Sequence, residues 1–439
     1  MNEELAAAAA AAGCPVAHTL APPRVSENAA AFNPFTGPYQ ADPATSLSWA
    51  RESEPVFFSP EINYWVVTRY DDCKQVFREF KNFSAVNTLY PFKEPTAEIA
   101  GILGDYGFVD MPGLSSMDPP AHREARKVNS VPFLPENIGY LEPRIREIIT
   151  RYIDQILEKD QADLVADVFW DVPAIVALIF MGIPDEDIDE VRHLALSMTT
   201  FTWGRPEEQE AVEAAHGMGR FWEMAGRVLR KLQAMENPQG WMGHVIKETR
   251  ERPELYTQTD LQGLLMGGVL AAHETTTNAS LNAIRALLEN RDQWEKICHD
   301  PTLIPGAVEE SLRYAGSVVA WRRRAWRDIE VGGVTIPEGG DILMVMASAN
   351  RDPRHFPDPD RFDIERENAR DHLTFGFGTH TCLGNNIARM EMRIFLEEFT
   401  SRIPGLRLQE QEYTFLANTS FRGPEQLLVT WDTRSRQLA

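Results

Sequence analysis

F-G-F-G-T-H-T-C-L-G, from Phe375 to Gly384, is the stretch that decides how this chain is interpreted. It places a single cysteine, Cys382, in a glycine-rich loop, two residues after His380 and just before a helical run from Asn386 to Phe399. No second cysteine or further histidine lies nearby to complete a zinc or iron–sulfur site. A lone thiolate in this setting suits one role well, the axial ligand of a haem iron.

The loop contains features that favour an ionised sulfur at Cys382. An apolar pocket alone would oppose ionisation, but a helix that begins just after the cysteine points its positive end at the sulfur. The glycines let backbone N–H groups approach closely. Phe375 is placed to pack against the loop and exclude water, and His380 to bind a haem propionate. Each residue alone has an ordinary explanation as core packing or as a turn, so it is the combination that carries the prediction.

The loop resembles the haem-binding motif of the cytochrome P450 family, F-G-x-G-x-H-x-C-x-G, at every fixed position. The resemblance implies a mainly α-helical fold with a small β region, forming a single haem-thiolate domain around haem b. We place this domain at residues 28–432. A flexible N-terminal tail (1–27) precedes it, and a short tail or the start of a linker (433–439) follows.

A second stretch, Leu264 to Asn278, reads L-L-M-G-G-V-L-A-A-H-E-T-T-T-N and is apolar enough for a buried helix. It nevertheless carries Glu274 and Thr275, and a buried carboxylate is costly. The ordinary explanation is a helix that surfaces towards solvent. The P450 pattern A/G-G-x-D/E-T-T matches here, with Ala272 in place of glycine. It implies that Thr275 hydrogen-bonds bound dioxygen and that Glu274 relays protons from solvent. His273 is assigned to the surface or to a supporting position.

Glu310 and Arg313 lie three residues apart in an expected helix, Pro301 to Tyr314, so they can pair on one face. Such ion pairs are common in helices. The resemblance implies that they form a triad with Arg361 which braces the haem loop, and loss of one member would leave a buried charge without a partner.

Four residues are candidates to bind the haem propionates. His122 and Arg126 are four apart on one helical face and match the family's H-x-x-x-R. Arg323 matches an arginine just before the first strand after the Glu310 helix, although arginines on both sides leave its register open by one residue. His380 is the fourth.

Apolar side chains in several segments are candidates for a substrate pocket, although such residues are more often plain core. They are Phe83, Leu89, Val269, Val319 and Phe421. Their character implies a small hydrophobic substrate.

The 439-residue chain is strongly acidic, with 65 Asp and Glu against 43 Lys and Arg and a net charge of −22. This balance argues against nucleic-acid binding, which needs a basic surface. The four cysteines are scattered, as in a reducing compartment. The alanine run from Ala6 to Ala12 follows acidic residues, unlike a secretion signal, and no apolar stretch is long enough to span a bilayer. We expect a cytoplasmic protein without a membrane anchor.

Elsewhere, the residue pattern predicts many helices and a few local strands. Short strands are expected within Val56 to Tyr70, in a hairpin within Ile329 to Ile336, and at Tyr413 to Leu416 and Leu427 to Trp431. Residues 83–117 are expected to form a long loop.

Several segments narrow the resemblance to the haem domain of self-sufficient bacterial monooxygenases, which is fused to a reductase carrying FMN and a [2Fe–2S] cluster. They include Ala29 to Phe35, Tyr64 to Tyr70 and Asn418 to Pro424. This chain has no cysteine run for such a cluster and no flavin fingerprint. It is therefore either an excised haem domain or a stand-alone relative with separate redox partners.

The resemblance implies O₂-dependent insertion of one oxygen atom into an aromatic or alkyl substrate, by hydroxylation or O-dealkylation, with electrons from NAD(P)H through a reductase. Two alternatives remain at this point. One is a peroxide-driven peroxygenase, and the other is a non-enzymatic haem sensor or carrier.

Overall fold

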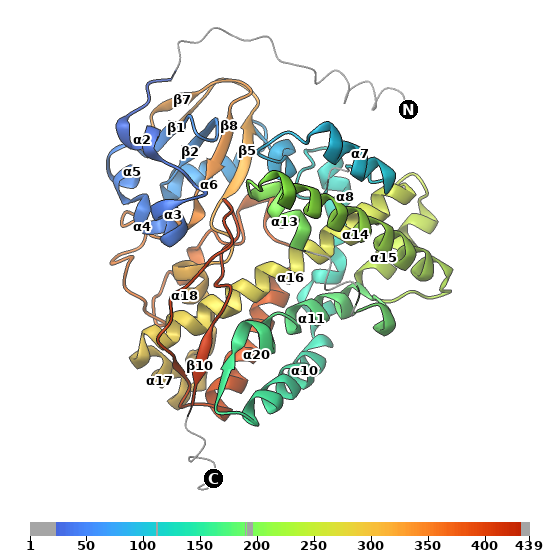
Figure 1. The fold of residues 1–439 in the computed structure, drawn as a ribbon, viewed down its shortest axis with the longest axis vertical. Helices are drawn as coiled ribbons and strands as arrows, with labels where there is room; N and C mark the ends of the chain where they lie inside the picture. The colour runs from blue at the N-terminus through green and yellow to red at the C-terminus, as the bar shows by residue number, and fades with distance from the viewer. Residues whose placement is uncertain (1–22, 111–112, 189, 191–195, 432–439) are drawn as a thin grey trace.

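One long helix, α16 (Gln258–Glu289), crosses the middle of the molecule, and the other elements are arranged around it (Figure 1). Thr257 caps its first turn, because the hydroxyl accepts from the N–H of Asp260 (3.1 Å) while the Asp260 carboxylate accepts from the N–H of Thr257 (2.8 Å). The helix packs against α11 (Val172–Met181), α14 (Glu208–Ala234), α18 (Ile304–Ala315) and α20 (Asn385–Arg402). The stretch from Leu264 to Asn278 thus lies within an enclosed helix, as predicted.

The computed structural model describes residues 23–110, 113–188, 190 and 196–431. Residues 1–22 of the tail expected at 1–27, and the whole tail expected at 433–439, therefore lie outside the described residues. Helices dominate and the β structure is small, which confirms the predicted fold class. The other described α-helices are α2 (Glu27–Ala31), α3 (Gly37–Ala41), α4 (Pro43–Ser46), α5 (Ser48–Ser53), α6 (Tyr70–Arg78), α7 (Ala97–Asp105), α8 (Ala121–Ser130), α9 (Pro135–Ile138), α10 (Leu141–Leu157), α13 (Leu196–Trp203), α15 (Gly240–Glu251), α17 (Arg291–His299) and α19 (Met346–Ala349).

The largest sheet brings together strands from distant parts of the chain. Its order is β1 (Val56–Ser59), β2 (Tyr64–Val67), β8 (Asp341–Met344), β5 (Trp321–Ala325) and β3 (Phe83–Ser84), with only β2 and β8 parallel. A second sheet contains β4 (Gln161–Asp163), β10 (Leu428–Thr430) and β9 (Arg407–Leu408). The hairpin of β6 (Ile329–Val331) and β7 (Val334–Ile336) is confirmed, and its turn uses two glycines with positive φ. Tyr413 to Leu416 does not form a strand and makes a single bridge, from Phe415 to Pro424.

The long loop expected at residues 83–117 contains a helix, α7 (Ala97–Asp105), which packs on α14. Thr96 caps α7 through the N–H of Ile99 (3.3 Å). Tyr106, just after α7, places its ring where a Cβ on Gly219 would lie, at 2.1 Å, and its hydroxyl is 3.3 Å from Nδ1 of His216. Because Gly219 has no side chain, the Tyr106 ring can pack directly on the backbone of α14 and hold this segment against the helix.

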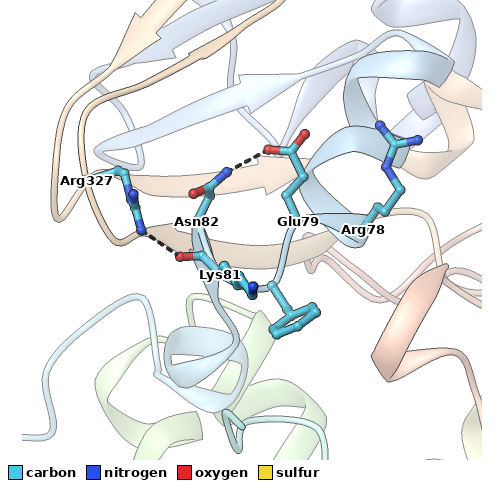
Figure 2. A pocket seen from close by; sticks show the side chains of 6 residues that line it. Arg78, Glu79, Lys81, Asn82 and Arg327 are labelled. Carbon is cyan, nitrogen blue, oxygen red and sulfur yellow. Dashed lines mark hydrogen bonds between the residues drawn. The ribbon is translucent and has the colours of Figure 1, made fainter.

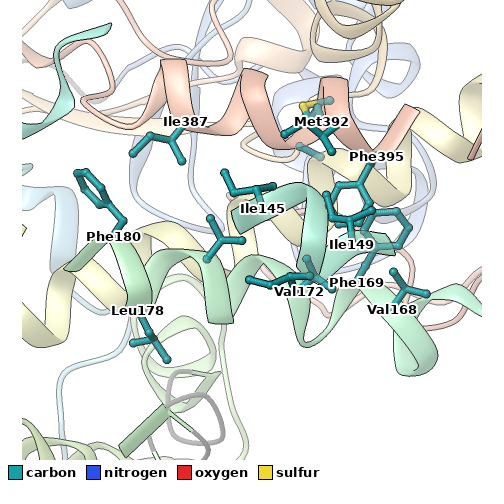
Figure 3. Packing of buried hydrophobic residues seen from close by; sticks show 14 of the residues in the cluster. Ile145, Ile149, Val168, Phe169, Val172, Leu178, Phe180, Ile387, Met392 and Phe395 are labelled. Atoms are coloured by element: carbon teal, nitrogen blue, oxygen red, sulfur yellow. The ribbon is translucent and has the colours of Figure 1, made fainter. Parts of the chain in front are cut away.

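The main hydrophobic core joins α10, α11 and α20 below α16. Figure 3 shows side chains from these helices interdigitating, with Ile145 and Ile149 of α10 facing Ile387 and Phe395 of α20. The rings of Phe169 and Phe395 lie 4.4 Å apart between their centroids. Each large apolar side chain buried here contributes roughly 1.5–3 kcal/mol. This packing fixes α20, the helix that begins just after the cysteine loop. No helix of the described chain combines the length and apolar character that crossing a membrane requires.

Candidate active site

The cysteine loop is shaped by two glycines and by the end of α6. Gly376 (φ +68°) and Gly378 (φ +75°) adopt left-handed conformations that favour glycine. A Cβ on Gly378 would lie 3.0 Å from the carbonyl oxygen of Phe77, so α6 approaches the loop backbone directly. The N–H of Cys382 donates to the carbonyl of Phe375 (2.9 Å), which closes the loop.

Cys382 is exposed as a residue, but protein atoms pack closely enough around its sulfur to weaken solvation of the charged form. Burial raises the pKa of its thiol. The backbone N–H groups of Gly384 and Asn385 and the guanidinium groups of Arg126 and Arg389 act in the opposite direction. The N–H donors are those expected from the start of α20. Arg389 also covers the ring of Phe375, with its guanidinium carbon 4.6 Å from the ring centroid.

His122, Arg126, Arg323 and His380 come together beside this loop. The rings of His122 and His380 stack with centroids 3.9 Å apart, and Arg126 donates to the carbonyl of Thr381. Both ring nitrogens of His122 and Nη2 of Arg323 are buried and have no hydrogen-bond partner among the described residues. Burial, with the nearby arginines, lowers the pKa of His122 to about 4 and that of His380 to about 2, so both rings are neutral at pH 7. Arg323 lies within β5, not before it as the sequence suggested.

Protein atoms do not cover one face of α16 around its midpoint. Ala271 is exposed, although it lies in the centre of an enclosed helix, and a Cβ on Gly267, one turn earlier, would meet no atom within 4 Å. Thr275 is on this face, and its hydroxyl donates to the carbonyl of Ala271 (2.7 Å). Glu274 is half-buried and accepts a hydrogen bond on Oε2 from Thr199 (2.5 Å), and burial raises its pKa to about 7.

His273 lies on a different side of α16 from this face. Its Nε2 is 2.8 Å from the carbonyl oxygen of Trp170, and its ring packs edge-on against the Trp170 indole. The residue is only 1% exposed, so the surface position considered from sequence is wrong. Its contacts are those of a supporting residue.

The predicted pair of Glu310 and Arg313 is completely buried and bidentate, at 2.7 and 2.8 Å. The third member predicted from sequence, Arg361, is wrong. Its side chain is 66% exposed and reaches only Asp363 (3.6 Å), while its carbonyl accepts from Arg313. Arg366, which is 8% exposed, contacts Glu310 instead (3.2 Å). The side chain of Arg361 points outwards and that of Arg366 points inwards. Because this segment contains several arginines, the sequence alone does not reveal which one is buried.

A second buried carboxylate, Glu309, was not anticipated. It pairs with Nε of Arg389 (2.7 Å) and with Nε2 of His372 (3.2 Å), which links α18 to the first turns of α20. Burial alone would raise its pKa, but these two hydrogen bonds outweigh burial and lower the pKa to about 2. The only sequence signal was a second glutamate beside Glu310.

The structure divides the five candidate substrate residues. Leu89 and Phe421 join an aromatic cluster with Trp203, Trp321, Leu270, Val318 and Met198. In this cluster the rings of Trp203 and Phe421 are 4.7 Å apart between their centroids. We call this set the aromatic cluster. Phe83 packs in the core beneath the large sheet, and Val269 packs in the main helical core. Val319 is buried, and its backbone N–H donates to the carbonyl of Ser420 (2.7 Å). Its neighbour Val318 belongs to the aromatic cluster instead, because successive residues of an extended chain point to opposite sides.

A separate hollow lies on the surface between the end of α6 and the tip of β5, as Figure 2 shows. It is lined by Arg78, Glu79, Phe80, Lys81, Asn82 and Arg327. Asn82 donates to Glu79 (2.8 Å), and Arg327 donates to the carbonyl of Lys81 (3.3 Å). None of the predicted site residues lines this hollow, but it adjoins the cysteine loop through Phe77 and Gly378.

Comparison with known proteins identifies the family. The family model for cytochrome P450 matches residues 229–403. Cytochrome P450 monooxygenase PikC of Streptomyces venezuelae is 31% identical over 405 residues, which cover 90% of this chain and 92% of the relative. The chain belongs to the cytochrome P450 family. Its curated relatives include named monooxygenases such as PikC, and members of the P450 family carry haem.

Two solved P450 structures are similar over most of the chain. An intact type IV self-sufficient cytochrome P450 monooxygenase has a TM-score of 0.91 and 49% identity, and the match covers 93% of this chain and 54% of that one. This chain therefore spans about half the length of that P450. Cytochrome P450 CREJ in complex with (4-ethylphenyl) dihydrogen phosphate has a TM-score of 0.87 and 36% identity, with 92% of this chain and 100% of that chain covered.

Proposed function

We propose that this P450 inserts one oxygen atom from O₂ into a small hydrophobic substrate, aromatic or alkyl, by hydroxylation or O-dealkylation, with Cys382 as the iron ligand. Haem, when bound, would supply the activation of dioxygen. The observation that carries the proposal is the position of the Cys382 sulfur at the start of α20, where Gly384 and Asn385 offer it their N–H groups. Such donors favour the thiolate, which is the form that binds iron.

The four polar residues beside the cysteine loop, which are His122, Arg126, Arg323 and His380, would suit the two carboxylates at the edge of haem. A buried donor without a partner costs about 1–3 kcal/mol, and the two carboxylates of haem b would accept from the one N–H of the neutral His122 ring and from Nη2 of Arg323. Arg126 and His380 would stand next to the same carboxylates. Phe375 and its covering Arg389 would shield the sulfur from water.

Thr275 and Glu274 support an O₂-dependent reaction over peroxide use, because peroxide brings its own protons and needs no relay. The Thr275 hydroxyl donates to Ala271, so its oxygen lone pairs can hold a water molecule on the uncovered face of α16. Glu274 has a pKa of about 7 and can give and regain a proton near neutral pH, as a relay acid must.

The aromatic cluster supports an aromatic substrate, since aromatic rings pack edge-on or offset with gains of about 0.5–1.5 kcal/mol per pair. The P450 CREJ is bound to an alkylphenyl phosphate, and this makes alkylphenols and their esters useful test compounds alongside aryl ethers and alkylbenzenes.

Electrons would come from NAD(P)H through a reductase with FMN and a [2Fe–2S] cluster, either in the same polypeptide or as a separate partner. The similarity to a self-sufficient P450 supports this source. The basic hollow of Arg78, Lys81 and Arg327 beside the cysteine loop would attract an acidic donor surface.

The proposal is tested first by the spectrum of the reduced, carbon monoxide-treated protein. Thiolate ligation gives a red-shifted Soret band, and Cys382→Ala should abolish it while Cys298→Ala leaves it unchanged. An unchanged spectrum in Cys382→Ala would overturn the proposal. Titration with the aromatic panel should then produce a spin-state change and, with O₂ and a reductase system, an oxygenated product. A spin-state change without product under any electron donor would favour the sensor alternative.

A further inference from the structure

Helix α13 places one hydroxyl against the candidate relay acid. Thr199 is fully buried, and its Oγ1 donates to Oε2 of Glu274 at 2.5 Å, across 75 residues of sequence. A hydroxyl-to-carboxyl contact this short is a strong hydrogen bond. Neither the P450 motifs nor the local sequence around Glu274 indicates it.

In the part of the chain that the structure describes, no charged group competes for this carboxyl. Helices α11 and α13, which pack across this part of α16, carry no charged side chain within their described spans. His273, the adjacent titratable residue on α16, is turned towards the Trp170 carbonyl. Among the described residues, no lysine, arginine or histidine acts on the pKa of Glu274 beside burial and the Thr199 hydrogen bond. The Thr199 hydroxyl is therefore the polar group that orients the acid.

We propose that Thr199 is a positioning residue, which holds Oε2 of Glu274 against α13 and leaves Oε1 to carry and pass the acid proton. This inference rests on the proposed relay role of Glu274. The carboxyl gives the Oε1 proton to a water molecule on the uncovered face of α16 and regains one from solvent. Thr199 keeps its own proton throughout, so no other reactant is needed.

The same helix connects this acid to the aromatic cluster. Trp203 lies four residues after Thr199, on the same face of α13, and it packs against Phe421 and Trp321. Thr199 and the aromatic cluster are thus held by the same turn of α13.

Thr199→Val tests the inference, because valine keeps the shape of threonine and removes the hydroxyl. Thr199→Ser restores the hydroxyl, and Thr200→Val is a matched control one residue along α13, where the hydroxyl makes no hydrogen bond to the described residues. The readout is the infrared C=O band of the protonated Glu274 carboxyl, identified by its loss in Glu274→Gln and followed against pH in the resting ferric protein.

In Thr199→Val the band should move to higher frequency, as a carbonyl does when it loses a hydrogen bond, and its titration midpoint should rise by about one pH unit. Thr199→Ser and Thr200→Val should keep the wild-type band and midpoint. Under turnover, Thr199→Val should release more hydrogen peroxide per NADPH than Thr199→Ser. A wild-type band position and midpoint in Thr199→Val would overturn the inference. That result would leave the thiolate spectrum, and hence the proposed haem ligation, untouched.

Discussion

Two carboxylates, Glu309 beside the cysteine loop and Glu274 on α16, have pKa values shifted in opposite directions. On the side of the cysteine loop, Arg389 and His372 overcome the effect of burial on Glu309 and bring its pKa to about 2. On α16, burial dominates at Glu274 and raises its pKa to about 7, with only Thr199 as a partner. Beside the cysteine loop, which we call the loop side, Glu309 therefore stays charged at neutral pH. On α16, which we call the α16 side, Glu274 gains or loses its proton near neutral pH.

The largest expected effect is the loss of a fixed charge on the loop side. Glu310→Ala leaves Arg313 buried without its anion and should lower the free energy of unfolding by about 3–5 kcal/mol. Arg361→Ala, at an exposed side chain, should change it by less than about 0.5 kcal/mol. Urea denaturation followed by tryptophan fluorescence measures both. Equal losses in the two variants would show that the assignment of Arg366 as the third partner is wrong.

On the α16 side, function should suffer more than stability. Thr275→Ala should lower product formed per NADPH by about tenfold and raise hydrogen peroxide correspondingly, because protons are no longer delivered in order. Thr275→Ser retains the hydroxyl and should stay near wild type. Coupling assays with a reductase system provide the measurement, and unaltered coupling in Thr275→Ala would contradict the relay.

The opposite pKa shifts predict opposite pH dependences of stability. Glu274 has a folded-state pKa above its ordinary value of 4.5, so its contribution is present below that value and is lost as pH rises through about 7. Glu309 has a lowered pKa, so its contribution is present above 4.5 and is lost as pH falls towards about 2. Between pH 5.5 and 8, the free energy of unfolding should fall by about 1–2 kcal/mol less in Glu274→Gln than in the wild type. An identical slope in both proteins would argue that Glu274 is not protonated in the fold.

Smaller effects on ligand affinity and on stability should distinguish residues of the aromatic cluster from residues that only pack in the core. Phe421→Ala should weaken the binding of an alkylphenol by several-fold, as measured by the spin-state change, because the ligand loses an aromatic contact. Val269→Ala, in the main core, should cost about 1.5–3 kcal/mol of stability and leave this affinity unchanged. The reverse pattern would place Val269 in the pocket.

The smallest expected effect concerns electron delivery. Arg78→Glu with Lys81→Glu should slow reduction by an acidic donor a few-fold at low salt, and the difference should shrink as salt screens the charges. Stopped-flow reduction under carbon monoxide measures the rate. A salt-independent difference would point to a structural fault instead of an electrostatic one.

Local motifs explain how much of the site could be predicted from sequence. The cysteine loop, the Glu310–Arg313 pair and the His122–Arg126 pair each lie within a few residues of sequence, where helix and loop geometry determine which side chains meet. The Thr199–Glu274 bond depends on how α13 packs over α16, and no periodicity in the sequence encodes that contact.

Two further errors have the same origin. Arg361 and Arg366 are chemically identical, and only the path of the chain decides which of them is buried. Phe83 is as apolar as Phe421, but it faces the sheet core because of its strand pairing with Ala325. The abundance of helices and the β6–β7 hairpin, by contrast, follow from local residue patterns, and the single haem-thiolate domain was implied by the resemblance of the cysteine loop to the P450 motif.

The bare backbone at Gly219 has a consequence for engineering. The ring of Tyr106 occupies the place of the missing Cβ, so even a single added carbon at position 219 would collide with it. A Gly219→Ala variant would act as a wedge that lifts the segment after α7 away from α14. One methyl group would in this way separate the docking of this segment from the packing of the rest of the helical core.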